Sequence, residues 1–339
     1  MSLQSQFKKF NDNIRLDYST DKELAKKRDI LLGILEKNNN LPSFSKLNQG
    51  SYAIFTGVYP DETREYDIDV GLRFNVNKSD YSPMDLKEEI ENSLDGHTYY
   101  GAEIKKPCVT VTYIKDGEPS FHVDLVTYVY DNKDDKESQM FIAKGKSTET
   151  QKWEKADPVG LVNYINNKVD DEDARNQFRR IVRYLKHWKH KRFVATGHSE
   201  PPSIGITLLV LKYFSGVKDD DLHALYNATV HIRNEFKFEG ISENGRDLYR
   251  IKLSLPFELN FEYNSDIFEK MSDIQMTDFR DKIIKLENDL KDVNDEVDEY
   301  EKCKKLQKIF GEEFEVPEES KLAKPQYNFL PGSSSAGME

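Results

Sequence analysis

The stretch from Gln49 to Phe74 reads QGSYAIFTGVYPDETREYDIDVGLRF, and the interpretation of the whole chain starts from it. In its second half, apolar residues at positions 68, 70, 72 and 74 alternate with polar or small ones. This period of two is typical of a half-buried strand, so Asp67 and Asp69 point to the same face. Side chains two positions apart on a strand lie roughly 6 to 7 Å from each other. The repulsion between two such carboxylates favours a bound divalent cation.

The first half of the stretch carries Gly50 and Ser51. Glycine permits close approach of the backbone, and serine adds a hydroxyl next to free N–H groups, a combination suited to phosphate. Phosphate at one end and a metal at the other indicate a nucleoside triphosphate. Taken alone, however, a Gly-Ser pair is a common turn, and an Asp-x-Asp on a strand is more often solvated. A third carboxylate on a neighbouring strand would favour the metal site.

A hairpin further along the chain supplies a third carboxylate. Alternating apolar residues predict strands over 109–114 and 121–126, joined by an Asp-Gly turn at 116–117. Asp124 is the charged residue on one face of the second strand. A single aspartate is more often solvated or capping, but its position after the first carboxylate strand favours a shared site.

Composition excludes several classes of protein. At 339 residues the chain is long enough for two compact lobes, and its 32% charged and 37% hydrophobic residues are typical of a soluble globular protein. The longest apolar run, 204–211, is too short to span a bilayer, and no signal-peptide core is present, so we expect a cytoplasmic protein without membrane contact. The net charge of -12 argues against a broad nucleic-acid-binding surface. Cys108 and Cys303 lie far apart in the sequence and support neither a zinc ribbon nor a disulfide framework.

The first half of the chain reads as a mixed α and β region. Helical periodicity predicts a helical start over 5–38 and a helix over 80–95 that crosses back over the sheet. The polar segment 131–157 is low in aliphatic residues and reads as a loop that leads into a different region.

Almost the whole second half reads as helical. An Asp-Pro pair at 157–158 is typical of a helix start, and further helices are expected over 173–190, 203–214 and 277–310. The lobe boundary is placed at this change of pattern. The expected organisation is a catalytic core over 1–155 whose N-terminal helix can span both lobes, a helical lobe over 156–325 and a flexible tail over 326–339.

The helix expected over 173–190 concentrates positive charge. Its basic residues outside the apolar face are Arg179, Arg180, Arg183, Lys186 and His190. Such a face is usually solvated, but in an acidic protein cations opposite a metal site also suit a triphosphate. Ser203, at the start of the next helix, is equally well explained as a cap.

Together these motifs resemble the polymerase-β-type nucleotidyltransferase superfamily. Residues 184–189 (YLKHWK) and 201–209 (PPSIGITLL) resemble the helical lobe of the oligoadenylate synthases. The N-terminal helix, Trp153 with the Asp-Pro pair, and residues 310–314 (FGEEF) resemble the bacterial cGAS/DncV-like nucleotidyltransferases, which make cyclic oligonucleotides in antiphage signalling. The resemblance implies an α+β fold with a mixed sheet, a C-terminal helical lobe and an active site in the cleft between them.

The resemblance also implies roles for individual residues. Two Mg²⁺ ions, for which Mn²⁺ could substitute, would be held by Asp67, Asp69 and Asp124, the last being nearest the attacking hydroxyl. The donor triphosphate would be cradled by Gln49, Gly50 and Ser51. Lys186 and Ser203 would reach that triphosphate from the helical lobe, and Arg183 would touch the acceptor.

The sequence departs from the relatives at two positions. Ile204 stands where the oligoadenylate synthases have an aromatic residue that stacks on the base, so base recognition must come from elsewhere. Thr127 stands where many relatives have proline, which affects strand geometry. The zinc ribbon of animal cGAS is absent from the sequence, so activation by duplex DNA is not implied.

The preferred interpretation is a cyclic di- or trinucleotide synthase, expected to be a monomer, that uses nucleoside triphosphates. The alternatives are a linear oligonucleotide or tRNA-end polymerase and, from a different class, a non-catalytic nucleotide or RNA sensor. The intact set of three carboxylates argues against the sensor, because a cluster of like charges is costly to retain. An operon-encoded regulator or an E1-like conjugating enzyme could be a partner. Conjugation is the minority hypothesis, because relatives that are conjugated usually end in Gly or Ala and this chain ends in Met338-Glu339.

Overall fold

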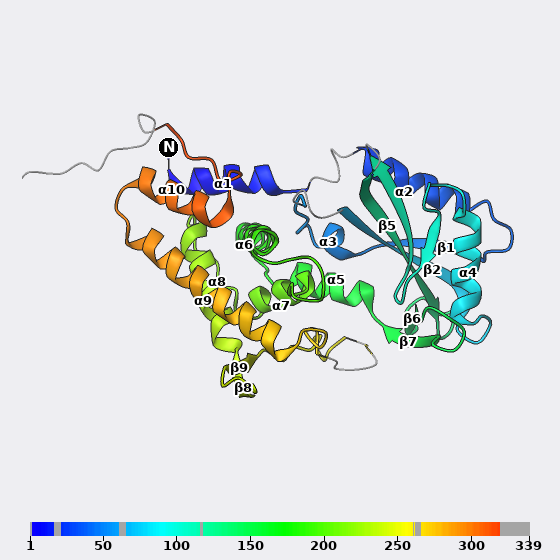
Figure 1. The fold of residues 1–339 in the computed structure, drawn as a ribbon. Coiled ribbons are helices and arrows are strands. Elements are labelled where there is room, and N and C mark those ends of the chain that lie inside the picture. The colour runs from blue at the N-terminus through cyan, green and yellow to red at the C-terminus, as the bar shows by residue number, and fades with distance from the viewer. Residues whose placement is uncertain are drawn as a thin grey trace, which may run out of the picture.

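The computed structural model describes residues 2–16, 22–60, 66–115, 118–259, 261 and 266–318. Within them, one hydrophobic core forms around a mixed sheet and another among helices (Figure 1). The turn expected at 116–117 and the tail expected at 326–339 lie outside the described residues.

A seven-stranded sheet organises the first core in the described part of the chain. Its strands are β1 (Phe44–Asn48), β2 (Tyr66–Asn77), β3 (Ala102–Ile104), β4 (Val109–Lys115), β5 (Glu118–Tyr130), β6 (Met140–Lys144) and β7 (Lys152–Ala156). Their order is β1-β2-β5-β4-β3, with β6 paired to β5 and β7 paired to β6. Strands β2 and β5 run parallel and the other pairs antiparallel, so the sheet is mixed and the expected α+β class is confirmed.

The two faces of this sheet have different surroundings. Ile68, Val70, Leu72 and Phe74 of β2 are buried, as the period of two predicts. They share a core with α2 (Lys22–Leu35) and α4 (Pro83–Leu94), which cover this face (Figure 1). The opposite face, which carries the carboxylates, turns toward the second lobe.

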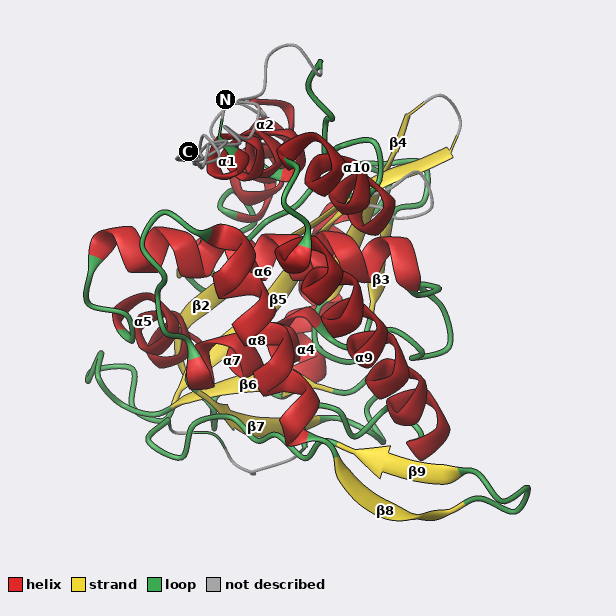
Figure 2. Ribbon diagram, turned by 90° about the vertical axis from the view of Figure 1, so that its left-hand side faces the viewer, coloured by secondary structure: helices red, strands yellow, loops and turns green. Residues whose placement is uncertain are grey.

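The second lobe consists mainly of helices. They are α5 (Pro158–Asn167), α6 (Glu172–Arg192), α7 (Ser203–Tyr213), α8 (Asp221–Glu235), α9 (Asp273–Asp295) and α10 (Glu299–Phe310). Helix α6 lies at the centre of this lobe, where it packs against α1, α7, α8 and α10 (Figures 1 and 2). The helices expected over 173–190 and 203–214 are confirmed to within a few residues.

The N-terminal region forms two helices with different partners. Helix α1 (Leu3–Ile14) places Phe7, Phe10 and Ile14 in the core of the helical lobe, whereas Leu31 and Leu35 of α2 join the core of the sheet. A single helical start over 5–38 was too simple, because its apolar residues belong to two separate cores.

Three expected features of the later chain were wrong. Segment 131–157 is not a loop throughout, since it contains β6 and β7, which extend the sheet from the end of β5. The helix expected over 277–310 is two helices, because Asp298 caps a new one by accepting from the backbone N–H groups of Tyr300 and Glu301. The second half is also not wholly helical, since β8 (Lys237–Ile241) and β9 (Asp247–Arg250) form a hairpin (Figure 2).

Candidate active site

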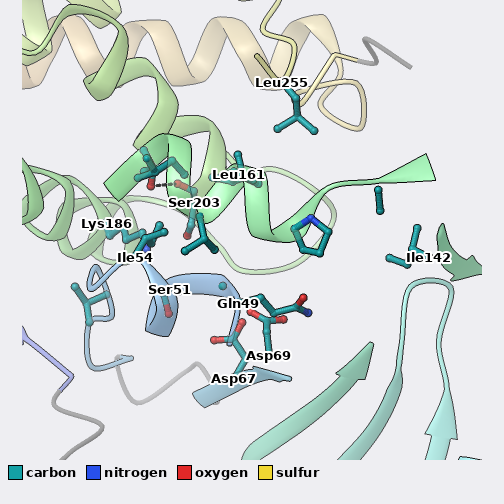
Figure 3. Close-up of a pocket in the computed structure, with 18 of the residues that line it drawn as sticks. Gln49, Ser51, Ile54, Asp67, Asp69, Ile142, Leu161, Lys186, Ser203 and Leu255 are labelled. Atoms are coloured by element: carbon teal, nitrogen blue, oxygen red, sulfur yellow. Dashed lines mark hydrogen bonds between the residues drawn. The ribbon is translucent and has the colours of Figure 1, made fainter. Parts of the chain in front are cut away.

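A cavity of about 920 Å³ lies between the sheet and the helical lobe (Figure 3). Seven of the expected site residues line it: Gln49, Gly50, Ser51, Asp67, Asp69, Lys186 and Ser203. They come from four places in the chain, namely the one-turn helix α3 (Gly50–Ala53) with its N-cap residue Gln49, strand β2, helix α6 and the first turn of α7. The turn that Gln49 and α3 form directly after β1 is called the Gly-Ser loop below. Asp124 and Arg183, which were also expected in the site, are not among the residues that line it.

The loop after β1 packs directly against the carboxylate strand. Gly50 has a φ of +63°, and a Cβ built on it would lie 2.0 Å from Oδ2 of Asp69. Only glycine therefore fits at this position without displacing the carboxyl group. The side chain of Gln49 is fixed against the sheet, because its Oε1 accepts a hydrogen bond of 3.0 Å from the hydroxyl of Tyr128 on β5.

The carboxylates lie on adjacent parallel strands in register. Asp69 on β2 is paired with Asp124 on β5, and Asp67 is paired with His122. Burial, together with the charges of Asp67 and Asp124, raises the pKa of the Asp69 carboxyl to about 7, although the charge of Lys186 acts to lower it. Three acidic groups therefore lie close together on two adjacent central strands of the sheet, and at least one of them resists ionisation.

The side chain of Asp124 is turned toward the neighbouring strand. Its Oδ1 accepts a hydrogen bond of 2.6 Å from Thr110 Oγ1 on β4, and its Oδ2 lies 4.0 Å from Nε2 of His122. No ready-made group of three His, Cys, Asp or Glu ligands is found in the part of the chain that the structure describes. The donor set still suits a hard divalent cation, since it consists of carboxylates whose mutual repulsion a cation would relieve.

Lys186 approaches the carboxylates from the opposite wall. Its Nζ donates hydrogen bonds to the carbonyl oxygen and to Oγ1 of Thr56, at 3.0 and 3.1 Å. Burial, together with the charge of Lys189, lowers its pKa to about 7, whereas the charges of Asp67 and Asp69 act to raise it. A triphosphate in the cavity would stabilise the ammonium form by supplying negative charge.

Ser203 contacts a second lysine rather than capping its own helix. The N-cap position of α7 is Pro202, and Oγ of Ser203 accepts a hydrogen bond of 3.0 Å from Nζ of Lys189, which also pairs with Glu200. Lys189 is three residues after Lys186 and also lines the cavity. Two lysines and a hydroxyl thus converge on this wall (Figure 3).

Arg183 lies outside the cavity lining. Its guanidinium is buried, with Nε donating to Oδ1 of Asn11 on α1 at 2.8 Å and Nη1 donating to the carbonyl oxygen of Phe55. The structure therefore does not place this side chain where it would touch an acceptor.

Several further polar residues of the cavity were missed at the level of sequence. Lys189 and His122 are among them, and both had a usable signal. Lys189 follows Lys186 at a spacing that keeps both on one side of a helix. His122 precedes Asp124 by two positions, so the alternation of β5 places the two on one face.

The first half of the chain matches a known family model. Residues 1–168 match the family described as Second Messenger Oligonucleotide or Dinucleotide Synthetase domain, abbreviated SMODS. The chain belongs to the bacterial cGAS/DncV-like nucleotidyltransferases. The match covers helices α1 to α5 and strands β1 to β7, and it ends just before α6.

Two curated relatives of this family member are synthases of cyclic dinucleotides by name. A cyclic GMP-AMP synthase from Escherichia albertii is 28% identical over 182 residues, which are 51% of this chain and 38% of that protein. A c-di-GMP synthase from Roseivirga ehrenbergii is 25% identical over 186 residues, which are 50% of this chain and 48% of that protein. The chain thus aligns with less than half of the length of either relative.

Solved structures of cGAS/DncV-like enzymes share the fold over most of the chain. The CD-NTase CdnG of Bradyrhizobium diazoefficiens, solved in complex with GTP, superposes with a TM-score of 0.68 at 14% identity and covers 93% of this chain and 97% of that one. DncV of Vibrio cholerae, a cyclic AMP-GMP synthase, superposes with a TM-score of 0.63 at 19% identity and covers 84% of this chain and 73% of that one. At such identities the likeness establishes the architecture of two lobes around a cavity.

No helix in the described ranges combines the length and the apolar character that a membrane span requires.

Proposed function

We propose that the protein is a nucleotidyltransferase that joins nucleoside triphosphates into a cyclic di- or trinucleotide, with release of pyrophosphate. One observation carries this proposal. The 920 Å³ cavity brings a Gly-Ser loop and two carboxylates on one wall against a buried lysine on the other. A triphosphate needs all three, because its charge must be neutralised while its α-phosphate is held beside the acidic groups.

The relatives support the cyclic product. Both curated relatives are named for cyclic dinucleotides, and a DncV structure was solved with a linear intermediate, 5′ pppA(3′,5′)pG. In that protein a linear dinucleotide therefore occupies the site before ring closure. The same order of events would suit the cavity between the two lobes of this chain.

The reaction is an in-line displacement at an α-phosphate by a sugar hydroxyl. When bound, two Mg²⁺ or Mn²⁺ ions held by Asp67, Asp69 and Asp124 would lower the pKa of that hydroxyl and stabilise the departing pyrophosphate. Asp124 is the carboxylate assigned to the acceptor side.

The chain's own groups would hold the triphosphate. The N–H groups and hydroxyl of the Gly50-Ser51 loop would bind it from the sheet side, beside Gln49. Lys186 and Lys189 would bind it from the helical lobe, with Ser203 between them. Since Lys186 has a pKa near 7 in the free protein, nucleotide binding would draw a proton onto its amine.

Antiphage signalling in the cytoplasm is the role that the family resemblance suggests. An operon-encoded regulator would then act on this enzyme, and the cyclic product would be its second messenger.

The test is incubation of the purified protein with Mg²⁺ and each mixture of nucleoside triphosphates, followed by mass spectrometry. A product whose mass equals that of a cyclic di- or trinucleotide is expected, and Asp69→Asn should give none. Linear products from the wild-type chain would favour the oligoadenylate-synthase-like alternative. Nucleotide binding without any product would favour the sensor.

A further inference from the structure

The backbone of the segment from Ala53 to Thr56, at the end of the Gly-Ser loop, is hydrogen-bonded to the helical lobe. Every carbonyl group except that of Ile54 accepts a hydrogen bond from a side chain of that lobe. Side chains of α5 and α6 reach its backbone. Asn166 Nδ2 donates to the carbonyl oxygen of Ala53 at 3.0 Å, Arg183 Nη1 donates to that of Phe55, and Lys186 Nζ donates to that of Thr56 at 3.0 Å. Three carbonyl groups of one short segment therefore depend on the other lobe.

Phe55 has a backbone conformation that phenylalanine rarely adopts. Its φ is +58°, in the left-handed region, which is unfavourable for a bulky side chain. Its ring is 60% exposed, so burial of the side chain does not offset this strain. The Arg179 guanidinium lies over the ring, with its carbon 4.5 Å from the centroid. The conformation is therefore stabilised by this contact of the ring and by the hydrogen bonds of the backbone at Phe55 and Thr56.

Arg183 makes the contact that a strained Phe55 needs. The residue is only 6% exposed, and its guanidinium is fixed at one edge by the hydrogen bond from Nε to Asn11. The other edge is directed at the Phe55 carbonyl oxygen. A buried, charged donor makes a strong hydrogen bond, and a fork with one arm already fixed loses little freedom in making the second.

This segment is connected to the loop that is proposed to bind phosphate. The N–H of Thr56 donates to the carbonyl oxygen of Ser51 at 3.0 Å, and the N–H of Ala53 donates to that of Gln49. A change in the backbone at Phe55 therefore changes the position of the Ser51 backbone, which lines the cavity.

We propose that Arg183 is a positioning residue, which holds Phe55 in its left-handed conformation and thereby sets the Gly50-Ser51 loop for a triphosphate. The inference rests on the proposed function, since it concerns the same loop. It assigns to Arg183 a role in substrate affinity without contact to substrate. The helical lobe then contributes to phosphate binding twice, directly through Lys186 and indirectly through Arg183.

The experiment compares Arg183→Met with Arg192→Met. Arg192 lies on the same helix and also donates to backbone carbonyl groups, those of Lys308 and Ile309, but far along the chain from the loop. It is therefore a control for the loss of an α6 arginine that donates to backbone carbonyl groups, at an exposed position. Hydrogen exchange at the Thr56 amide, KM for the nucleoside triphosphates and kcat are measured for both variants.

Arg183→Met is expected to speed exchange at Thr56 and to raise KM about tenfold, with kcat changed less than threefold, because the loop must be ordered when nucleotide binds. Arg183→Lys should restore part of the affinity, since an amine can also donate to the Phe55 carbonyl. Arg192→Met should leave both the exchange at Thr56 and KM within twofold of wild type.

A second comparison tests whether Arg183 acts through the conformation of Phe55. Glycine adopts positive φ readily, so Phe55→Gly should make the loop less dependent on Arg183. KM of Phe55→Gly/Arg183→Met is expected within about threefold of KM of Phe55→Gly alone. A full tenfold effect of Arg183→Met in the glycine background would overturn the proposal.

Two other results would overturn the inference. One is unchanged exchange at Thr56 together with a raised KM, which would mean that Arg183 itself touches the nucleotide. The other is identical behaviour of the Arg183→Met and Arg192→Met variants in every measurement. If the wild-type protein makes no product at all, the proposed function fails separately. The exchange measurement and calorimetric binding of a non-hydrolysable GTP analogue with Mg²⁺ would then still decide on Arg183.

Discussion

Gly50 lies where the phosphate loop meets the carboxylate strand. An alanine there would combine an unfavourable φ of +63° with a Cβ 2.0 Å from the Asp69 carboxylate. We expect Gly50→Ala to displace that carboxylate and to slow synthesis about 100-fold, as small misplacements in active sites do. Its cost in free energy of unfolding should be only about 1–2 kcal/mol. The measurements are the rate of product formation and denaturant unfolding.

The control for this variant is Gly33→Ala. Gly33 lies inside α2, and nothing lies within 4 Å of a Cβ built on it. Alanine is favoured over glycine in a helix by about 1 kcal/mol, so this variant should be slightly more stable and fully active. Full activity of Gly50→Ala would contradict the position that the structure gives to Asp69.

Asp69 makes the stability of the protein depend on pH. Its pKa is about 7 in the folded state against 3.8 in the unfolded chain, so the folded state binds more protons between these values. Without metal, stability should therefore fall as pH rises from about 4 to 7, and the loss should be complete above 7. Asp69→Asn should abolish this dependence and melt several degrees higher than wild type at pH 8, as relief of roughly 1–3 kcal/mol would cause.

Magnesium should reverse the order of thermal stability of wild type and Asp69→Asn at pH 8. Wild-type protein should gain thermal stability on addition of Mg²⁺ at pH 8, because ions bind the ionised carboxylates. Asp67→Asn and Asp69→Asn should gain little and should make no product while remaining folded. Turnover by either variant at the wild-type rate would exclude the metal-site assignment.

Lys186 and Ser51 should differ in their effect on nucleotide affinity. Lys186 supplies a full charge, so Lys186→Ala is expected to raise KM by about ten- to a hundredfold, whereas Ser51→Ala loses one neutral hydrogen bond and should raise it about fivefold. Nucleotide affinity of the wild type should also weaken as pH rises above 7, since the amine must then take up a proton to bind. Steady-state kinetics over pH 6.5–9 test this pH dependence. An unchanged KM for Lys186→Ala would mean that the amine of Lys186 only donates hydrogen bonds to Thr56 and does not bind the triphosphate.

The sequence was informative about residues whose chemistry is unusual for their element. Two aspartates on one face of a strand, or a glycine before a serine, indicate little when taken alone, but their combination with a third carboxylate on a later strand favoured a function. It was less informative about α6, because a basic residue on a helix can face solvent, a ligand or another element. Arg183 and Lys186 are three residues apart, yet one contacts Asn11 and the other lies at the cavity. Only the packing of α1 against α6 decides between these positions.

At the scale of elements, strong periodicity predicted the type of an element correctly, and weak periodicity did not. Helix α4 and strand β2 have clear apolar patterns and lie where they were expected. Strands β6 and β7 are only five residues long, and charged residues such as Lys152 and Glu154 mask their alternation. They form because β5 extends beyond β4 and offers its last residues, 128–130, for pairing.

The break between α9 and α10 can be tested through its cap. Asp298 accepts from two backbone N–H groups at the start of α10, so Asp298→Ala should lower the free energy of unfolding by about 1 kcal/mol. Asp292→Ala, at an exposed position inside α9, is the control and should be neutral or slightly stabilising. Both variants should keep wild-type synthesis, since neither residue lines the cavity. An equal effect of the two substitutions would argue for one continuous helix.

At the scale of the molecule, the cavity exists only because two lobes meet. One wall belongs to the sheet and the other to a helical core whose central helix supplies Lys186 and Lys189. Asn11 and the Phe55 carbonyl oxygen, on either side of the Arg183 guanidinium, connect α1 and the phosphate loop to that same helix. Substrate binding therefore depends on the contact between the two lobes.

The last prediction is that the product is cyclic rather than a growing linear chain. A processive polymerase must hold a long acceptor strand, which calls for a basic track beside the site. The net charge here is -12, and three arginines of α6 are already used within the fold: Arg180 pairs with buried Asp221, Arg183 binds Asn11, and Arg192 binds carbonyl groups of α10.

A short linear intermediate needs only a cavity in which it can bind again in the reverse orientation, so that its free hydroxyl attacks its own triphosphate. The product should therefore be treated with phosphatase and compared with untreated product by anion-exchange chromatography. A cyclic product has no terminal phosphate, so its elution position should not change. A ladder of species that shift after phosphatase treatment would instead show that successive nucleotides are added to a strand held outside the cavity. Such a strand would have to be bound by a surface of this acidic protein other than α6.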